Sequence, residues 1–231
     1  MQPYFFPYIG YWQLMNVVDQ YVVYDDVNYK KGSWVNRNRI LTLKKLEGWS
    51  YINLNLDHAS AYKKFNEISV LRDRKYKDNF FGIIKDSYKK APFFLDVFPL
   101  LEKIMMQDET NLANFLKFSF DVINSYLGIH TKFILSSNIS KNNELKKEEK
   151  VIDICKILGA DQYYSAMGGW NLYSKEEFAK HGIEFIFLKT KDSIRYQQFQ
   201  NEFIPNLSII DVMMFNDVPT IQKMLLEYEL L

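Results

Sequence analysis

The chain has 231 residues, with 29 Lys and Arg against 28 Asp and Glu, and a single cysteine. This length suits one α/β domain, and the near-neutral charge argues against nucleic acid as the main partner, because phosphate binding usually shows as a basic excess. One cysteine cannot form an intrachain disulfide, and the sequence shows no signal peptide and no apolar run of membrane-spanning length. We therefore expect a cytoplasmic protein.

The first part of the chain predicts a helix, a strand and a hairpin. Tyr11–Val18 has the apolar spacing of a helix, and Tyr21–Tyr24 is β-branched and aromatic, as in a buried strand. Arg39–Lys45 and Trp49–Leu56 both alternate apolar and polar residues. The connection between them contains a glycine and has hairpin length, so we predict a β-hairpin. Asp57–Asp78 reads as a loop or short strands.

Three helices are predicted next, at Asn79–Lys90, Leu95–Met106 and Leu112–Leu127. Leu112–Leu127 has the clearest apolar stripe, and Gly128 follows it as a C-terminal cap. Together these helices predict a mainly helical insertion over about residues 76–128.

The second half alternates strands with helices. We predict strands at Thr131–Leu135, Gln162–Ser165 and Ile183–Leu188, with helices at Val151–Leu158, Lys175–His181, Ile209–Phe215 and from Pro219. A strand–helix–strand alternation is typical of right-handed crossovers in a parallel sheet. The fold expected for the single domain 1–231 is therefore a mainly parallel sheet flanked by helices, with a Rossmann-like or nucleotidyltransferase-like layout.

Four unusual clusters fall where strands should end: Gln2–Pro7, Asp25-Asp26, Ser136-Ser137 and Ser165–Gly169. In open α/β sheets, ligands bind outside the carboxyl ends of the strands. If the strands are parallel, all four clusters gather on one rim, which is the predicted site. Within it we expect the Gln2 side chain and the rings of Tyr4 and Tyr11 to contact substrate.

Two acids and one phenol are the candidate catalytic groups. Asp25 and Asp26 are adjacent, so their side chains point to opposite faces of an extended backbone. One can act as a base or bind a ligand hydroxyl while the other caps a turn, and two acids alone are a weak signal for a metal. Tyr196 can act as an acid or orient a substrate, whereas Asp211, three residues after Ser208, has the spacing of a structural capping box.

The stretch SWVNRNRI carries the anion-binding candidates Trp34, Asn36, Arg37 and Arg39. In an alternating backbone Arg37 and Arg39 share one face, and guanidinium groups suit phosphate or carboxylate. The alternatives are a surface strand with solvated charges, or pairing of the arginines with Asp25 or Asp26. We favour anion binding, because an indole so close to guanidinium groups suits a nucleotide or a sugar phosphate.

The remaining candidates carry weaker signals. Gly168 and Gly169 let backbone amides approach a phosphate or sugar, although such a pair is also typical of a turn. Ser136 and Ser165 follow strands, where a serine most often caps a helix. Arg195 stands beside Tyr196, and the three histidines and one cysteine do not have the spacing of a zinc site.

Three stretches, QPYFFPYIGYWQL, YDDVNYKKGSWVNRNRI and RYQQFQNEFIPNLSIIDVMMFN, together resemble the WbqC-like family of bacterial proteins. Members of this family are found with genes for O-antigen and other surface polysaccharides. The resemblance implies a glycine or other aminoacyl transferase acting on a polysaccharide sugar. Family members usually have a short apolar run before the QPYF motif. Here Met1 takes that place, so we expect either that this strand is absent or that the natural start lies upstream.

The layout Tyr8-Ile9-Gly10-Tyr11 also resembles the opening of nucleotidyltransferase-like folds, where a helix N-terminus faces phosphate. Tyr8 and Tyr11 stand where those enzymes place histidines. Adenylyl transfer by that mechanism is therefore not expected.

Two hypotheses follow. The protein transfers an acyl or aminoacyl group from an activated donor, with no other cofactor evident, to an amino sugar that a nucleotide carries. Alternatively, it is a non-catalytic protein that binds a nucleotide-sugar or another enzyme of the same polysaccharide pathway, as a monomer or an oligomer. A deep cleft with a carboxylate would suit transfer, and a shallow aromatic groove would suit recognition.

Overall fold

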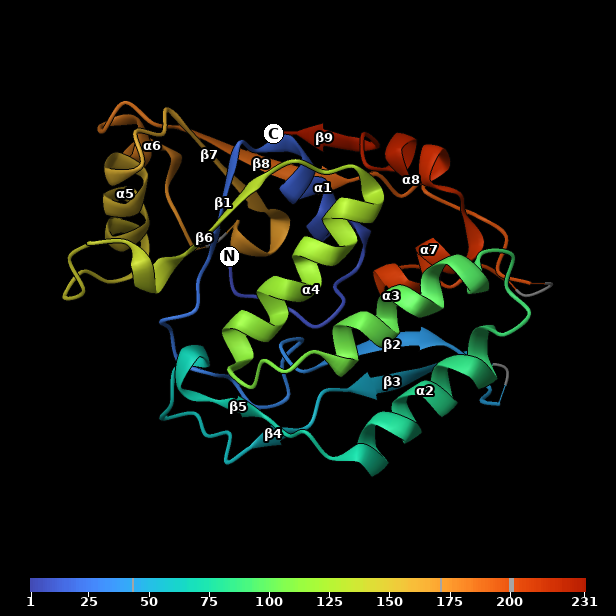
Figure 1. Ribbon diagram of the computed structural model, residues 1–231. Coiled ribbons are helices and arrows are strands. Elements are labelled where there is room, and N and C mark those ends of the chain that lie inside the picture. The colour runs from blue at the N-terminus through green and yellow to red at the C-terminus, as the bar shows by residue number, and fades with distance from the viewer. Residues whose placement is uncertain (43, 171, 200–201) are drawn as a thin grey trace.

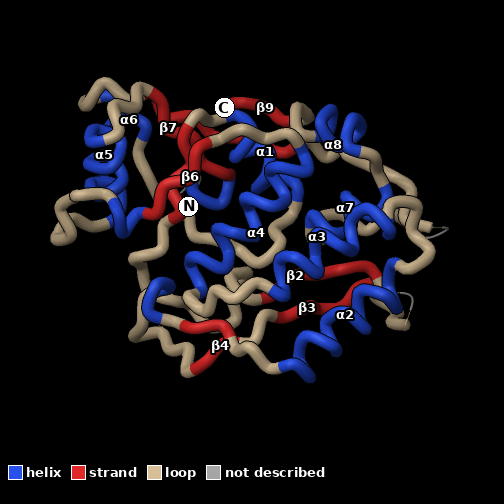
Figure 2. The backbone as a smooth tube through the Cα atoms, viewed as in Figure 1, coloured by secondary structure: helices blue, strands red, loops and turns tan. Residues whose placement is uncertain are grey.

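Helices and short strands alternate along the computed structural model, which describes residues 1–42, 44–170, 172–199 and 202–231. In this part of the chain, eight α-helices accompany four small sheets, so the protein is α/β, as predicted (Figure 1). Figure 2 shows how short the strands are relative to the helices. Among the described residues no helix is both long and apolar enough to cross a membrane.

Helix α1 (Ile9–Val17) begins two residues before the predicted helix and is almost wholly buried. Gly10 explains its close packing. A Cβ atom at this position would lie 2.4 Å from the hydroxyl oxygen of Thr190 and 2.5 Å from the ring of Tyr8. Only glycine lets α1 approach the strand that carries Thr190 so closely.

Strand β1 (Gln20–Val23) pairs in parallel with β6 (Lys132–Leu135). Beside β1, the amide of Tyr24 donates to the carbonyl oxygen of Met1 over 2.8 Å. Strand β7 (Gln162–Ala166) pairs in parallel with β8 (Glu184–Thr190), and β9 (Tyr228–Leu230) adds to β8 in the antiparallel direction.

The single, mainly parallel sheet that the sequence predicts is not formed by the hydrogen bonds among the described residues. Two separate parallel pairs take its place, one of them extended by an antiparallel strand. The parallel direction of both pairs agrees with the prediction, but alternation along a chain does not show whether such pairs join into one sheet. The three residues of β9 are too few to show a period.

The predicted hairpin is present. Strand β2 (Arg37–Leu41) pairs antiparallel with β3 (Trp49–Asn53), and Arg39 lies opposite Tyr51. Both strands are shorter than predicted, and Leu43, inside the first predicted strand, lies outside the described residues. Two further short strands, β4 (Leu56–Asp57) and β5 (Ser69–Val70), form a second antiparallel pair. Strand β4 begins at Leu56, the last residue of the predicted hairpin strand, and β5 lies within the segment predicted to be a loop or short strands.

The remaining elements are helices: α2 (Arg74–Tyr88), α3 (Phe94–Met106), α4 (Leu112–Leu127), α5 (Lys147–Ile157), α6 (Lys175–Ala179), α7 (Ile209–Phe215) and α8 (Val218–Met224). Helices α4 and α7 have the predicted bounds, and Gly128 ends α4 in the left-handed conformation. Helix α2 begins five residues before the predicted helix, because the side chain of Asp73 accepts a hydrogen bond from the amide of Lys75 as an N-cap. Helix α5 begins four residues early.

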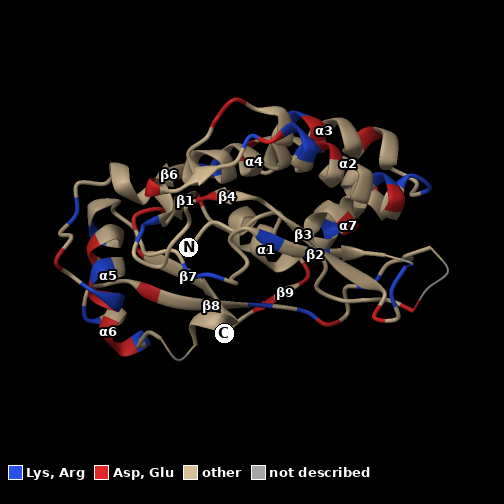
Figure 3. Ribbon diagram, turned by 90° about the horizontal axis from the view of Figure 1, so that it is seen from below, with Lys and Arg blue, Asp and Glu red and all other residues tan. Residues whose placement is uncertain are grey.

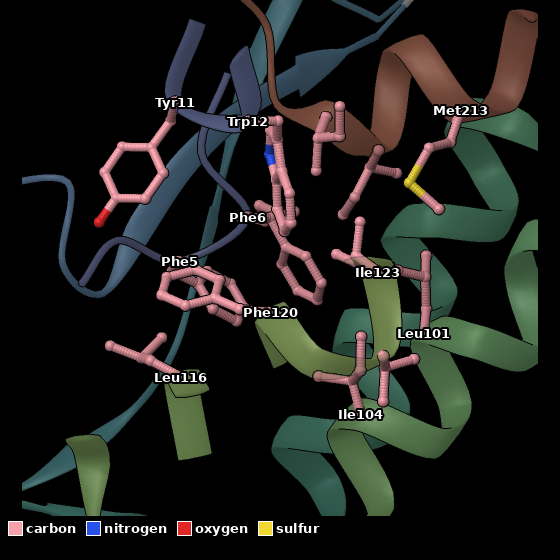
Figure 4. Close-up of a cluster of buried hydrophobic side chains, with 14 of the residues drawn as sticks. Phe5, Phe6, Tyr11, Trp12, Leu101, Ile104, Leu116, Phe120, Ile123 and Met213 are labelled. Carbon is pink, nitrogen blue, oxygen red and sulfur yellow. The ribbon is translucent and has the colours of Figure 1, made fainter. Parts of the chain in front are cut away.

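The main hydrophobic core lies between the opening residues, the hairpin and the helices α2, α3, α4 and α7 (Figure 4). Phe5, Phe6, Tyr11 and Trp12 all contribute to it and are buried. A smaller cluster lies between α5, α6 and strands β7 and β8, and it includes the buried Cys155. These four aromatic residues of the opening motif are therefore part of the hydrophobic core.

Candidate functional site

A pocket of about 270 Å³ lies where the opening loop meets the hairpin and the segment before α7. Its lining consists of Tyr4, Pro7, Tyr8, Trp34, Asn38, Arg39 and Asn206. Three of these seven residues are aromatic and one carries a guanidinium group, and no carboxylate is among the described residues that line the pocket.

The opening loop at this pocket is held in a strained conformation. Phe6 is buried and has a φ of 43°, which is uncommon for a residue other than glycine. The Asn38 side chain donates to the carbonyl oxygens of Phe5 and Phe6 over 3.0 and 2.9 Å. The Ser208 hydroxyl also donates to the Phe6 carbonyl oxygen, over 2.8 Å. Strain of this kind persists only where neighbouring groups fix it, and here β2 and the start of α7 do so.

Arg39 lies between two indole rings at the pocket. Its guanidinium carbon is 5.1 Å from the ring centroid of Trp49 and 5.8 Å from that of Trp34. Its Nη2 donates to the carbonyl oxygen of Asn206 over 3.3 Å. Such cation–π contacts hold the charge in place without neutralising it.

Arg37 shares the face of β2 that carries Arg39, as the alternation predicts. Its guanidinium carbon lies 4.8 Å from the ring centroid of Tyr51 and 6.0 Å from that of Trp34. Within the described residues, neither arginine has a carboxylate at ion-pair distance. The alternative of pairing with Asp25 or Asp26 is therefore not observed there.

Asn36 has a different role from its neighbours in SWVNRNRI. Its side chain donates to the carbonyl oxygen of Leu54 over 3.1 Å and accepts a hydrogen bond from the hydroxyl of Tyr29. These bonds tie the start of β2 to the chain that leaves β3, and they occupy the amide that was predicted to contact substrate.

The phenols of the opening motif divide between pocket and core. Tyr4 and Tyr8 line the pocket, and burial raises the pKa of both, an effect that a hydrogen bond to Thr190 partly offsets in Tyr8. Tyr11 is buried, with its ring 5.9 Å from that of Tyr21, and its hydroxyl donates to the carbonyl oxygen of Gln2. Tyr11 and Gln2 are therefore bonded to each other and do not line the pocket.

A second polar cluster lies at the carboxyl ends of β1 and β6. The Asp25 carboxylate is buried and accepts hydrogen bonds from the amide and hydroxyl of Ser137, over 2.9 and 2.7 Å. Asp26 points elsewhere, as predicted for adjacent residues, and pairs with Lys141 at 2.7 Å. Lys141 also donates to the carbonyl oxygen of Ser136.

The Asp26–Lys141 pair is almost removed from solvent, since the two side chains are 9% and 1% exposed. Burial alone would raise the pKa of Asp26. The ammonium group of Lys141 and the Ser136 hydroxyl outweigh that effect and hold the pKa below its ordinary value. The side chain of Asp26 is thus ionised and occupied by a structural partner.

Ser165, Gly168 and Gly169 lie at the end of β7, where the last two belong to a short turn. A Cβ atom on Gly169 would lie 2.6 Å from the hydroxyl oxygen of Ser165, so a side chain there would displace that hydroxyl. The pocket holds Tyr4 but neither Asp25 nor Gly168. The structure thus brings Asp25 and Ser137, after β1 and β6, into contact. The opening loop lines the pocket instead, so the four clusters do not form one site.

Tyr196 belongs to a buried network around Asp211. Its hydroxyl donates to Asp211 over 2.7 Å, and Tyr88 and Gln198 donate to the same carboxyl group over 2.8 and 2.6 Å. Burial raises the pKa of Asp211 to about 6, although these hydrogen bonds favour the ionised form. Arg195 lies with its guanidinium carbon 5.6 Å from the ring centroid of Phe203. None of these residues lines the pocket.

Three pocket residues were missed by sequence reasoning: Tyr8, Asn38 and Asn206, whereas Pro7 belongs to the predicted cluster Gln2–Pro7. Asn38 stands between the two arginines, and alternation places it on the opposite face of β2, where it can reach the opening loop. That signal was available in the sequence. Asn206 was not predictable, because only the tertiary fold brings residues near 206 to the hairpin.

In the view of Figure 3, positively and negatively charged residues are not separated onto different sides of the molecule. Lys and Arg are interspersed with Asp and Glu along α2, α3, α5 and α6 (Figure 3). No group of three or more His, Cys, Asp or Glu side chains that could hold a metal ion occurs in residues 1–42, 44–170, 172–199 and 202–231.

The structure therefore defines an α/β protein with an aromatic pocket that contains a guanidinium group. The chain belongs to the WbqC-like protein family, whose model matches residues 2–223. It is 26% identical over 214 residues to the uncharacterized protein Rv1507c of Mycobacterium tuberculosis (strain ATCC 25618 / H37Rv), and the match covers 92% of this chain and 90% of that relative. No solved structure matches.

Proposed function

We propose that the pocket beside Trp34 and Arg39 binds a nucleotide-linked sugar in the cytoplasmic stage of bacterial surface-polysaccharide biosynthesis. The observation that carries this proposal is the guanidinium group of Arg39, which lies at an aromatic pocket with no carboxylate at ion-pair distance in the described part of the chain. Guanidinium groups suit phosphate, and the adjacent aromatic side chains supply apolar contact area with polar hydroxyls. The pathway is inferred from the family.

The size of the pocket limits what it can enclose. Ligand pockets commonly measure about 300–1,000 Å³ and bury most of a drug-sized ligand. At about 270 Å³ this pocket suits a single sugar ring with its phosphate. The nucleoside would then extend over the exposed face of the hairpin, where Trp34 and Tyr51 are 38% and 37% exposed.

Acyl or aminoacyl transfer to the bound sugar, from an activated donor, is the second candidate. The observation in its favour is that the hydroxyl-bearing rings of Tyr4 and Tyr8 line the pocket, where they can orient an amino group. Deprotonation of that amino group needs a base. The described lining contains no carboxylate, and Asp25 and Asp26 are engaged with Ser137 and Lys141. The geometry thus favours recognition over transfer.

Thermal-shift screening tests the binding proposal. Wild-type protein is heated with UDP-glucosamine and other nucleotide-sugars, with free nucleotides and with coenzyme A derivatives. A ligand at a hundredfold excess over its Kd stabilises the fold by about 2.7 kcal/mol, which such a screen detects. We expect a shift with nucleotide-sugars that Trp34→Ala abolishes. The absence of any shift in the wild type would overturn the proposal.

Transfer is tested separately by mass spectrometry. The nucleotide-sugar that binds best is incubated with the protein and with acyl-coenzyme A or an aminoacyl donor. An acylated sugar that forms only with active protein would establish the second candidate, and binding without product would establish recognition alone.

A further inference from the structure

The exposed face of the hairpin carries two guanidinium groups around one indole. The guanidinium carbons of Arg37 and Arg39 lie 6.0 and 5.8 Å from the ring centroid of Trp34. Each arginine also lies over a second ring, Tyr51 for Arg37 and Trp49 for Arg39, at 4.8 and 5.1 Å. The aromatic side chains therefore hold both positive charges on the same face of the hairpin.

These two charges have few partners in the described part of the chain. Nη2 of Arg37 donates to the carbonyl oxygen of Gly32, and Nη2 of Arg39 donates to that of Asn206. Within the same residues, Nη1 of neither arginine makes a hydrogen bond. By contrast, the guanidinium groups of Arg72 and Arg74 face Asp108 and Asp78.

Two like charges held close together repel each other, and this repulsion costs free energy unless an anion lies between them. Residues two apart on a strand are separated by roughly 7 Å, and two long side chains can converge from that distance on neighbouring phosphates. The net charge of the chain is only +1, which favours a small anionic ligand over a nucleic acid.

Building on the proposed function, we propose that Arg37 and Arg39 together bind a diphosphate. Arg39, at the pocket, contacts the phosphate attached to the sugar, and Arg37 contacts the phosphate attached to the nucleoside. The nucleoside lies against the exposed faces of Trp34 and Tyr51. The ligand class is therefore a nucleoside-diphosphate sugar, and Arg37 is the residue that distinguishes it from a sugar monophosphate.

Isothermal titration calorimetry with matched ligands tests this assignment. UDP has the sugar-side phosphate that UMP lacks, so this pair probes Arg39. UDP-glucosamine has the nucleoside-side phosphate that glucosamine 1-phosphate lacks, so this second pair probes Arg37. We expect wild-type protein to bind UDP about tenfold or more tightly than UMP, since one charge-assisted contact is worth that factor. Arg37→Gln should weaken UDP-glucosamine about tenfold, leave glucosamine 1-phosphate unchanged and keep the ratio of UDP to UMP affinity, since UDP and UMP share the phosphate that Arg37 contacts. Arg39→Gln should weaken UDP-glucosamine and glucosamine 1-phosphate alike.

Two further variants keep the test decisive. Arg72→Gln removes the same charge from an arginine that already has a carboxylate partner, and it should change no affinity. Arg37→Lys keeps the charge but loses the planar fork, so it should retain part of the wild-type affinity for UDP-glucosamine. Circular dichroism and Tm confirm that each variant is folded.

The outcomes separate the two proposals. If wild-type protein binds UDP-glucosamine and Arg37→Gln binds it with wild-type affinity, the diphosphate assignment is wrong and the pocket remains a sugar-phosphate site. If wild-type protein binds none of the four ligands, both proposals are wrong.

Discussion

Asn38 donates a hydrogen bond from its side chain to the carbonyl oxygen of Phe6 over 2.9 Å, across 32 residues of sequence. This bond joins β2 to the strained opening loop. Arg39 is the next residue after Asn38, and Tyr8 lies two residues after Phe6. The same bond therefore fixes the positions of Arg39 and Tyr8, on two walls of the pocket, relative to each other. The pocket thus depends on a buried polar contact rather than on apolar packing alone.

Replacing Asn38 with alanine should destabilise the fold. The carbonyl oxygen of Phe5 would lose its donor, and one buried unsatisfied group costs about 1–3 kcal/mol. The Phe6 carbonyl oxygen would keep its bond from Ser208. Urea denaturation measures this change. Asn143→Ala, at an exposed position, is the control and should change the free energy of unfolding by less than about 0.5 kcal/mol. Equal effects of the two variants would contradict this account.

Replacing Gly10 with alanine should disturb the pocket through Tyr8. The new methyl group would lie within 2.5 Å of the Tyr8 ring and of Thr190, and overpacking of this kind costs about 1–3 kcal/mol. The matched control is Gly82→Ala in α2, where no atom lies within 4 Å of the new Cβ. There we expect a gain of about 0.5–1 kcal/mol. Thermal unfolding distinguishes the two, and a stabilised Gly10→Ala variant would show that α1 packs less closely than described.

The sequence predicts more of the secondary structure than of the site. The bounds of α4 and α7 follow from their apolar periodicity and caps, and the hairpin follows from alternation around a glycine-containing turn. These signals are local. The early start of α2 depends on one capping side chain, Asp73. The division of the parallel strands into two separate pairs depends on long-range contacts that no local pattern encodes.

Breaking the Asp26–Lys141 pair should be costly. Lys141→Met leaves a buried carboxylate without its cation, which costs about 3–5 kcal/mol at neutral pH. Lys90→Met, at an exposed position, should cost less than about 0.5 kcal/mol. Denaturant unfolding at neutral pH makes the comparison.

The pH dependence provides a second check on this pair. Because the pKa of Asp26 is lowered in the wild type, its contribution to stability is present above the unfolded-state pKa and is lost as pH falls through the folded-state pKa. In Lys141→Met, burial would instead raise that pKa, so the loss relative to the wild type should shrink in acid. A loss that is independent of pH would exclude the ion pair as its cause.

Asp211 should make the fold less stable as pH rises. Its pKa is raised from 3.8 to about 6, so its contribution is fully present below the unfolded-state value and is lost as pH rises through 6. The loss is on the order of 3 kcal/mol. Asp211→Asn stays neutral, so its unfolding free energy should lack this decline between about pH 4 and 6, whatever its absolute level. Parallel curves for the two proteins would contradict the raised pKa.

For the site, the sequence predicted which types of residue line the pocket, but it did not predict where in the fold the pocket lies. Trp34 and Arg39 were predicted from the closeness of an indole and guanidinium groups, and both line the pocket. Asp25 and Asp26 also follow a strand, but strand-end carboxylates serve structure as readily as chemistry, and here Ser137 and Lys141 occupy them. Whether a polar side chain has a structural partner depends on the tertiary fold.

The most direct test of the account is a calorimetric titration of UDP-glucosamine into the wild type and Arg39→Gln, with Arg72→Gln as the matched control. Loss of a charge-assisted contact is worth about 1.5–3 kcal/mol, so we predict binding to Arg39→Gln that is roughly tenfold to a hundredfold weaker, and unchanged binding to the control. Equal affinity of the wild type and Arg39→Gln would show that the ligand binds elsewhere and would contradict the account.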